Sequence, residues 1–248
     1  MRKLFTEKAD KIIKLAGDDH KHLSLVLRAR AGDSVMVSTG DGYDYTYIVD
    51  AVSARETVLK QAGKRLNESE PAKISLTLFS AVLKGDKNDT AVRMCTELGV
   101  QKFCPIITEY SVAAQESYKA GRLRKIALEA AKQSGRGRVP EICEPVTFHE
   151  MLEKLYAYDL VLFLYERAEK PDVKTFLQEK LHNSTEHTRT VRTVAAIVGG
   201  EGGFSEQEAG KLLDGGVTPV TLGKRILRAD TACAAVCALI HYEAEEME

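Results

Sequence analysis

The feature that most constrains the fold of this chain is an apolar run that ends abruptly in glycine. Residues 195–198 read Ala-Ala-Ile-Val, and residues 199–203 read Gly-Gly-Glu-Gly-Gly. Ser205 and Glu208 then have the spacing of a capping box, which opens a helix. Glycine has no Cβ and adopts positive φ at little cost, so glycines at the end of a strand let the backbone approach a ligand closely. The pattern predicts a strand, a ligand-binding loop and a helix.

A second glycine turn, Leu222 followed by Gly223, precedes another predicted helix. A tight turn between strand and helix would be the simpler explanation for two glycines alone. Four glycines and a second glycine turn favour a ligand pocket instead. The spacing matches neither the dinucleotide-binding glycine fingerprint nor the P-loop, so neither of those folds is indicated.

The first part of the chain has a different pattern from the rest. Between residues 1 and 70, a short helical start is followed by alternating apolar runs that are separated by glycine and aspartate turns. This pattern is typical of a small β-barrel or β-meander. The polar segment 65–71 ends in Pro71, and we place the domain boundary there, with domains at 1–70 and 71–248.

From residue 73 onward, apolar strands alternate with helices. We predict strands at 74–82, 103–107 and 160–165 and in the run before the glycine loop, helices at 118–133, 148–156 and 172–181, and a polar loop at 182–192. Strands that are apolar on both faces indicate an α/β domain with a mostly parallel sheet.

Composition restricts the class of protein further. The 248 residues are 44% hydrophobic and 29% charged, as in ordinary soluble proteins. No apolar run reaches the length of a membrane span, and charges interrupt the N-terminus before a signal-like core develops, so we expect a cytoplasmic protein. The net charge of −1 does not by itself suggest nucleic acid, but basic residues gather between positions 119 and 140. That cluster is either a solvated helix face or a phosphate-binding surface.

Cysteine and histidine give no sign of a metal or a disulfide framework. The five cysteines are odd in number and contain no Cys-x-x-Cys pair. Cys233 and Cys237 have the spacing of one helix face, and we expect both to be buried. The six histidines have neither the zinc-protease nor the triad spacing, and we expect surface or loop positions for all of them.

The two glycine segments together, 199–205 and 222–232, resemble the SPOUT class of RNA methyltransferases. Within that class, the chain resembles the RsmE family, which methylates N3 of a uridine in 16S ribosomal RNA during ribosome biogenesis. Supporting stretches lie at 22–28, 97–100 and 129–136. The chain departs from the family twice: Gly200 stands where the family has proline, and Asp230, after Ala229, stands where it has glutamate after threonine.

The resemblance implies a SPOUT-type knotted parallel α/β domain, preceded by a small PUA-like β-barrel, in a homodimer. It also implies that loops at the ends of strands bind S-adenosylmethionine. On this sequence the cofactor-binding residues would be Leu164, Val198, Gly199, Gly200, Gly202, Gly203, Leu222, Gly223, Ile226 and Leu227. No metal is implied.

Uridine N3 carries a proton and becomes a nucleophile only when that proton leaves. A cation near O2 or O4 would stabilise the uridinate, and Arg228 and Arg136 are the candidates for this role. An ion pair with Asp230 at the helix start is an equally good explanation for Arg228. Glu201 or Asp230 would accept the proton, although Glu201 fits a structural role in the glycine loop better. Contacts to the RNA backbone are assigned to Arg28, Lys84, Arg122, Arg124 and Arg138.

The expected partner is 16S ribosomal RNA or the assembled small subunit. Two alternatives stay open at this point. One is a SPOUT enzyme that acts on tRNA or on a ribose 2′-hydroxyl, and the other is a non-catalytic RNA-binding homologue, as the departures at Gly200 and Asp230 allow.

Overall fold

The computed structural model describes residues 3–71, 73–111, 118–182 and 190–247. The chain divides into two compact units. The first is Met1–Glu70 together with Ala131–Val139, and the second is Pro71–Ala130 together with Pro140–Glu248. The first unit thus takes in a distant segment, 131–139, that the sequence pattern did not indicate.

The first unit is built on a five-stranded sheet with the order β1-β3-β4-β5-β2. Its strands are β1 (Lys3–Phe5), β2 (Ile12–Leu15), β3 (Ser34–Ser38), β4 (Tyr43–Val52) and β5 (Thr57–Leu66), and α1 (Gly17–Lys21) and the π-helix η1 (His22–Val26) follow β2. Only β1 and β3 pair in parallel. Tyr45, Tyr47 and Val49 alternate into the core, as a half-buried strand requires. The expected meander corresponds to the antiparallel run β3-β4-β5.

Buried polar groups tie segment 131–139 to the rest of the first unit. Lys3 Nζ lies 2.9 Å from Asp44 Oδ1 and donates to the carbonyl of Gly135 at 2.7 Å. Asn67 Nδ2 donates to Asp44 Oδ2 at 2.8 Å and to the same carbonyl at 3.1 Å. Each of these buried polar atoms therefore has a partner, as burial demands.

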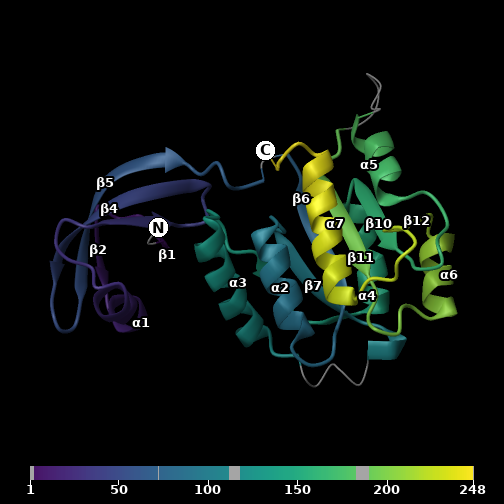
Figure 1. Cartoon of the computed structure of the whole chain (residues 1–248), viewed down its shortest axis with the longest axis horizontal. Helices are drawn as coiled ribbons and strands as arrows, with labels where there is room; N and C mark the ends of the chain where they lie inside the picture. Colours follow the sequence, from purple (N-terminus) through teal and green to yellow (C-terminus); the bar gives the residue numbers. More distant parts are fainter. Residues whose placement is uncertain (1–2, 72, 112–117, 183–189, 248) are drawn as a thin grey trace. The chain divides into compact units, whose positions relative to one another are not determined.

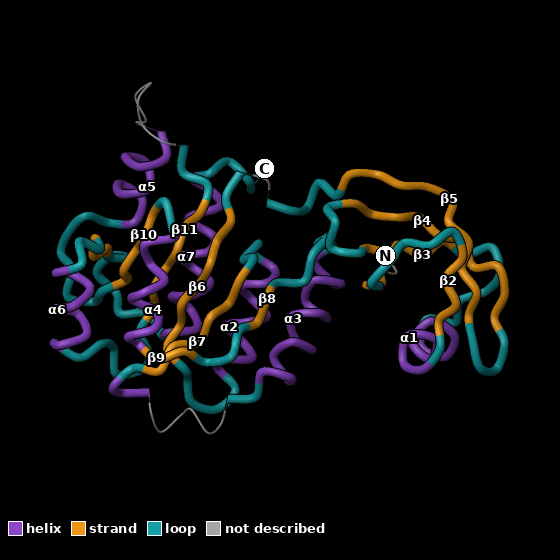
Figure 2. The backbone as a smooth tube through the Cα atoms, turned by 180° about the vertical axis from the view of Figure 1, so that it is seen from behind, coloured by secondary structure: helices purple, strands orange, loops and turns teal. Residues whose placement is uncertain are grey.

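The second unit is built on a parallel sheet with the order β12-β10-β11-β6-β7-β8, and β9 also pairs with β7 (Figures 1 and 2). Its strands are β6 (Ser75–Ala81), β7 (Lys102–Ile107), β8 (Glu141–Ile142), β9 (Val146–Thr147), β10 (Leu160–Leu164), β11 (Thr193–Val198) and β12 (Thr218–Val220). The predicted parallel α/β sheet is confirmed.

Helices cover both faces of this sheet. The helices of this unit are α2 (Lys87–Glu97), α4 (Phe148–Lys154) with the 3-10 turn η3 (Leu155–Ala157), α5 (Val173–His182), α6 (Glu206–Asp214) and α7 (Ala229–Glu243). A further helix, α3 (Ala120–Ser134), begins in this unit, and its last residues belong to the first. Figure 1 shows α2 and α7 in front of the sheet, and the view from behind in Figure 2 shows α4 on the opposite face. Met151 of α4 and Leu212 of α6 join Phe79, Phe163 and Ile197 in one core. This layering is typical of α/β domains.

Two expectations about single residues have different outcomes. Cys233 and Cys237 are fully buried on α7, as predicted. The surface assignment of the histidines is wrong for His20 and His241, because both are buried beside polar partners: His20 Nδ1 lies 2.9 Å from Thr57 Oγ1, and His241 Nδ1 lies 2.8 Å from Glu246 Oε2. Position 187 lies outside the described residues.

Two features are absent from the described residues. No helix there has the length and apolarity needed to cross a membrane. The same residues contain no group of histidine, cysteine and acidic side chains that could hold a metal ion.

Candidate functional site

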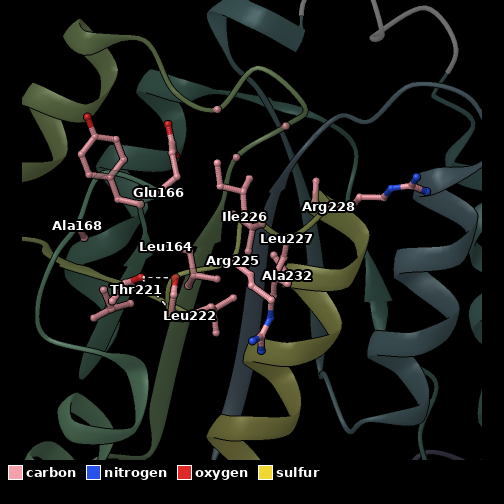
Figure 3. Close-up of a pocket in the computed structure, with 18 of the residues that line it drawn as sticks. Leu164, Glu166, Ala168, Thr221, Leu222, Arg225, Ile226, Leu227, Arg228 and Ala232 are labelled. Carbon is pink, nitrogen blue, oxygen red and sulfur yellow. Dashed lines mark hydrogen bonds between the residues drawn. The ribbon is translucent and has the colours of Figure 1, made fainter.

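The candidate site lies where three neighbouring parallel strands end. Leu164, at the end of β10, is in register with Val198 at the end of β11 and with Val220 at the end of β12. The loops that follow these strands therefore meet at one edge of the sheet, the usual ligand position in such folds. They line a cavity of about 1220 Å³ (Figure 3).

The cavity brings together the two glycine turns that the sequence analysis singled out. All ten predicted cofactor-binding residues line it, and so do Glu201 and Arg228. The lining also includes residues that sequence reasoning missed, among them Glu166, Thr221, Lys224 and Arg225. A signal for Glu166 exists, because it stands two residues past the end of β10 just as Gly200 stands two residues past the end of β11.

Backbone geometry explains why the first turn is made of glycine. Gly203 has φ +68°, and its amide donates to the carbonyl of Gly200 at 3.1 Å. A Cβ at Gly203 would lie 2.8 Å from Glu166 Oε1, and a Cβ at Gly199 would lie 3.0 Å from the ring of Phe204. Side chains at these two positions would therefore displace the wall of the cavity or distort the loop.

The capping box at the start of α6 fixes the far end of this loop. Ser205 Oγ accepts from the amide of Glu208 at 3.3 Å, and Glu208 Oε2 accepts from the amide of Ser205 at 3.0 Å. Glu208 Oε1 also accepts from the amide of Glu109 at 2.9 Å. One buried carboxylate thus holds both the helix start and the segment after β7.

The second turn is held by Thr221. Its Oγ1 accepts from the amide of Gly223 at 3.1 Å, and Gly223 has φ +100°. The amide of Thr221 donates to the carbonyl of Pro171 at 3.1 Å, so the loop after β10 is bonded to the loop after β12. Beyond the turn, Ile226 is 87% exposed. The turn therefore presents apolar side chains, among them Ile226 and Leu227, to the cavity.

Glu201 has the contacts of a structural carboxylate. Its Oε1 lies 2.8 Å from Lys87 Nζ and accepts from the amide of Lys84 at 3.3 Å. Burial opposes ionisation, but the hydrogen bond from Lys87 and the backbone amides outweigh it and lower the pKa of Glu201. A carboxylate with a lowered pKa is a weaker general base. These contacts favour the structural explanation over proton transfer.

Arg228 is free of the ion pair that the sequence left open. It occupies the N-cap position of α7, and within the described part of the chain no ion pair joins it to Asp230. Asp230 Oδ1 instead accepts from the amide of Thr231 at 3.0 Å. The guanidinium is exposed, and Figure 3 shows its side chain extending away from Thr221 and Leu222.

Comparisons with known proteins show the family of this chain. The model of a family described as an RNA methyltransferase domain matches residues 70–241. The chain is 31% identical over 221 residues to ribosomal RNA small subunit methyltransferase E of Synechocystis, which covers 89% of this chain and 69% of the relative. The chain belongs to the ribosomal RNA small subunit methyltransferase E family. The family member of Bacillus subtilis is 28% identical and covers 93% of this chain and 90% of its own.

A solved structure from this family has the same fold. The ribosomal RNA small subunit methyltransferase E of Neisseria gonorrhoeae, bound to S-adenosyl methionine, superposes with a TM-score of 0.81 at 24% identity. The match covers 98% of this chain and 97% of the neighbour. It extends across both compact units, whereas the family model begins at residue 70.

Arg136, expected to act in the family's chemistry, has the contacts of a structural residue. It is 2% exposed, lies in the first unit, and its Nη2 is 3.1 Å from Glu70 Oε2, while its Nε also donates to that carboxylate. A buried guanidinium held by two bonds to one carboxylate is a structural group.

The five arginines and lysines assigned to RNA contact differ in their surroundings. Arg122 pairs with Asp89, and Arg124 Nη2 lies 2.7 Å from Glu144 Oε1. The other three, Arg28, Lys84 and Arg138, are exposed, and their side chains form no ion pair within the described residues. Only these three present an uncompensated charge.

Proposed function

We propose that this chain transfers a methyl group from S-adenosylmethionine to N3 of a uridine in 16S ribosomal RNA. Family membership supports the substrate class. The observation that carries the site assignment is the cavity that the glycine turns after β11 and β12 share with the loop after β10. A neighbour with the same fold is described as bound to S-adenosyl methionine.

The residues of the cavity fit that cofactor. The glycine loop lines the cavity without side chains at four positions, so a nucleoside can approach its backbone closely. Leu164, Val198, Ile226 and Leu227 offer apolar surface for a flat base. When bound, S-adenosylmethionine supplies an electrophilic methyl group on a sulfonium. The chain aligns that group with its acceptor.

Arg228 is our candidate for stabilising the uridinate. It lines the cavity, is exposed, and has no carboxylate partner within the described residues, so its charge is available to a substrate. Asp230, which adjoins the lining residues Arg228 and Ala229 without lining the cavity itself, is the remaining candidate for accepting the N3 proton, because Glu201 is already engaged by Lys87. Arg136 has no part in this assignment.

We assign the finer architecture on family grounds. The first unit would be a PUA-like β-barrel that binds RNA, the second would carry the deep trefoil knot of SPOUT domains, and the enzyme would act in the cytoplasm as a homodimer. Arg28, Lys84 and Arg138 are the preferred RNA backbone contacts, because their charges are uncompensated within the described residues.

A methylation assay tests the reaction. Unmodified 16S ribosomal RNA, small subunits and total tRNA are each incubated with the chain and labelled S-adenosylmethionine, and nucleosides are analysed by mass spectrometry. We expect N3-methyluridine from ribosomal RNA or subunits only. Label in tRNA or on a ribose 2′-hydroxyl would assign the chain to another SPOUT activity, and cofactor binding by calorimetry without any transfer would indicate a non-catalytic homologue.

The variant Arg228→Ala tests whether Arg228 acts in methyl transfer or in cofactor binding. We expect turnover to fall about 100-fold with little change in cofactor affinity, because the guanidinium acts on charge that develops at the uridine. Arg167→Ala is the matched control, since Arg167 is exposed, pairs with Glu206 and does not line the cavity. Equal turnover in both variants would remove Arg228 from the chemistry.

A further inference from the structure

Two cysteines lie side by side at the edge of the parallel sheet. Strand β7 pairs with β8 so that Phe103 is opposite Ile142, and the next positions are Cys104 and Cys143. The amide of Cys143 donates to the carbonyl of Phe103 at 3.0 Å, which continues the ladder by one step. The two Sγ atoms are 2.7 Å apart and share a hydrogen bond. Neighbouring strands have the separation that a disulfide between such residues requires.

The surroundings give the two sulfurs different properties. Cys104 is buried, whereas Cys143 is half-buried and can meet a small solute. The hydrogen bond from Cys104 lowers the pKa of Cys143 against the effect of its burial, and Lys102 acts in the same direction. That hydrogen bond and burial raise the pKa of Cys104. Cys143 is therefore the better nucleophile, and Cys104 keeps its proton.

The other three cysteines provide an internal contrast. Cys95, Cys233 and Cys237 are fully buried. Burial raises the pKa of Cys233 to about 12, although it has a hydrogen bond to Ser80 Oγ at 3.4 Å. Thiols of this kind are inert towards oxidants in solution.

We propose that Cys104 and Cys143 form a reversible disulfide when the protein meets a hydroperoxide. The Cys143 thiolate attacks the peroxide, an S–O bond forms as the O–O bond breaks, and the alkoxide or hydroxide that leaves takes up a proton. The Cys104 sulfur then attacks the Cys143 sulfenic acid, so that the S–S bond forms, the S–O bond breaks, and the Cys104 proton leaves with hydroxide as water. Two thiols are oxidised by two electrons in total, and a dithiol reductant reverses the reaction.

This site is separate from the methyl-transfer site. Neither cysteine lines the cavity. The bond would join residues 39 positions apart and fasten the segment between β8 and β9 to β7. Because a cross-link restricts the unfolded chain, we expect the oxidised protein to melt about 5 °C or more above the reduced protein.

Thiol counting on the full chain tests the proposal. The protein is treated with hydrogen peroxide, denatured, alkylated with iodoacetamide and analysed by mass spectrometry. We expect two of the five cysteines to escape alkylation, one peptide pair joined through Cys104 and Cys143, and full alkylation after dithiothreitol. Five alkylated cysteines, a link between other cysteines, or Cys143 oxidised to sulfinic acid without a link would each overturn the proposal.

Variants check the assignment within the same assay. Cys143→Ser should abolish the cross-linked peptide, whereas Cys237→Ser, which removes one of the buried thiols, should leave it intact. The peptide map of the unaltered protein decides the matter if either variant fails to fold. A link that persists in Cys143→Ser would contradict the pairing.

Discussion

At the scale of single residues, the site depends on positions where a side chain would have no room. Gly203 has φ +68°, which selects glycine there, whereas Glu166 Oε1, 2.8 Å from its Cβ position, ends an exposed side chain that can move aside. At Gly202 the constraint is steric: a Cβ there would lie 3.0 Å from the side chain of Tyr110. By contrast, a Cβ at Gly200 would lie 3.5 Å from that of Ala81, an ordinary contact. The departure from proline at Gly200 is therefore not enforced by crowding.

Gly203→Ala should destabilise the fold by about 2 kcal/mol, because alanine is strained at positive φ and its methyl group would displace Glu166. Gly210→Ala is the matched control, since Gly210 lies inside α6 with no atom near its Cβ position. That change should stabilise the fold by about 0.5–1 kcal/mol. Urea unfolding of both variants measures the difference, and equal effects would contradict the role given to Gly203.

Asp44 gives a pH dependence at the same scale. Burial opposes its ionisation, but hydrogen bonds from Ser38, Lys3 and Asn67 prevail and hold its pKa below the ordinary 3.8. The pKa of Asp44 is thus lower in the folded than in the unfolded chain. The stability that ionised Asp44 contributes is therefore complete above about pH 4 and is lost as pH falls through the folded pKa. Asp44→Asn leaves Lys3 buried without its counter-charge and should cost about 3 kcal/mol at neutral pH.

The measurement is thermal unfolding from pH 3 to pH 7, with the unaltered chain beside the variant. The difference between their melting temperatures should decrease towards pH 3. A constant difference across the range would show that Asp44 contributes through packing alone.

At the scale of elements, the sequence predicts helices and long strands more clearly than very short strands. The sequence predicted α6 from its capping box and β11 from its apolar run, because each signal lies within a few consecutive residues. Strands β8 and β9 have two residues each, too few for any periodicity, and only their pairing with β7 defines them. His241 was misassigned for a related reason, because its burial depends on Glu246 and on packing that no local pattern records.

Two capping boxes allow a paired test of the element that supports the glycine loop. Ser205→Ala in α6 and Thr147→Ala in α4 each remove an N-cap acceptor and should each cost about 1 kcal/mol. Only Ser205 adjoins the glycine loop, so only Ser205→Ala should also weaken cofactor binding. Calorimetry with S-adenosylmethionine is the readout, and equal affinities in the two variants would detach α6 from the binding site.

At the scale of the whole molecule, the sequence specified the kind of sheet but not its order. Alternating strands and helices predicted a parallel sheet, while the neighbours β12-β10-β11-β6-β7-β8 follow from contacts between distant segments. That order brings Glu166 and Thr221 to the cavity that the glycine loop lines, and for Thr221 no local pattern indicated this position. The resemblance to a family led us to assign the cofactor to the two glycine turns and Leu164, and the folded sheet places all ten of these residues around one cavity. The burial of Arg136 against Glu70 had no local signal.

Binding of RNA by the full chain should weaken steeply with salt, because cations released from the backbone drive the association. Arg138→Ala should reduce the slope of log K against log salt by about 0.7–0.9, the value for one phosphate contact. Arg124→Ala should change the slope less, since Glu144 already compensates that charge. Filter binding over a range of salt concentrations tests both, and identical slopes for the two variants would remove Arg138 from the RNA surface.

The cavity takes its wall from segments around residues 164–172, 198–203 and 220–232, which only the assembled sheet brings together. A partly folded second unit that lacks any one of these strands has no cavity. A small molecule that fits the cavity therefore binds only the fully folded unit. By mass action, a higher concentration of that molecule lowers the fraction of the protein in which this unit is unfolded. The same concentration therefore slows degradation by proteases, which cleave the unfolded form.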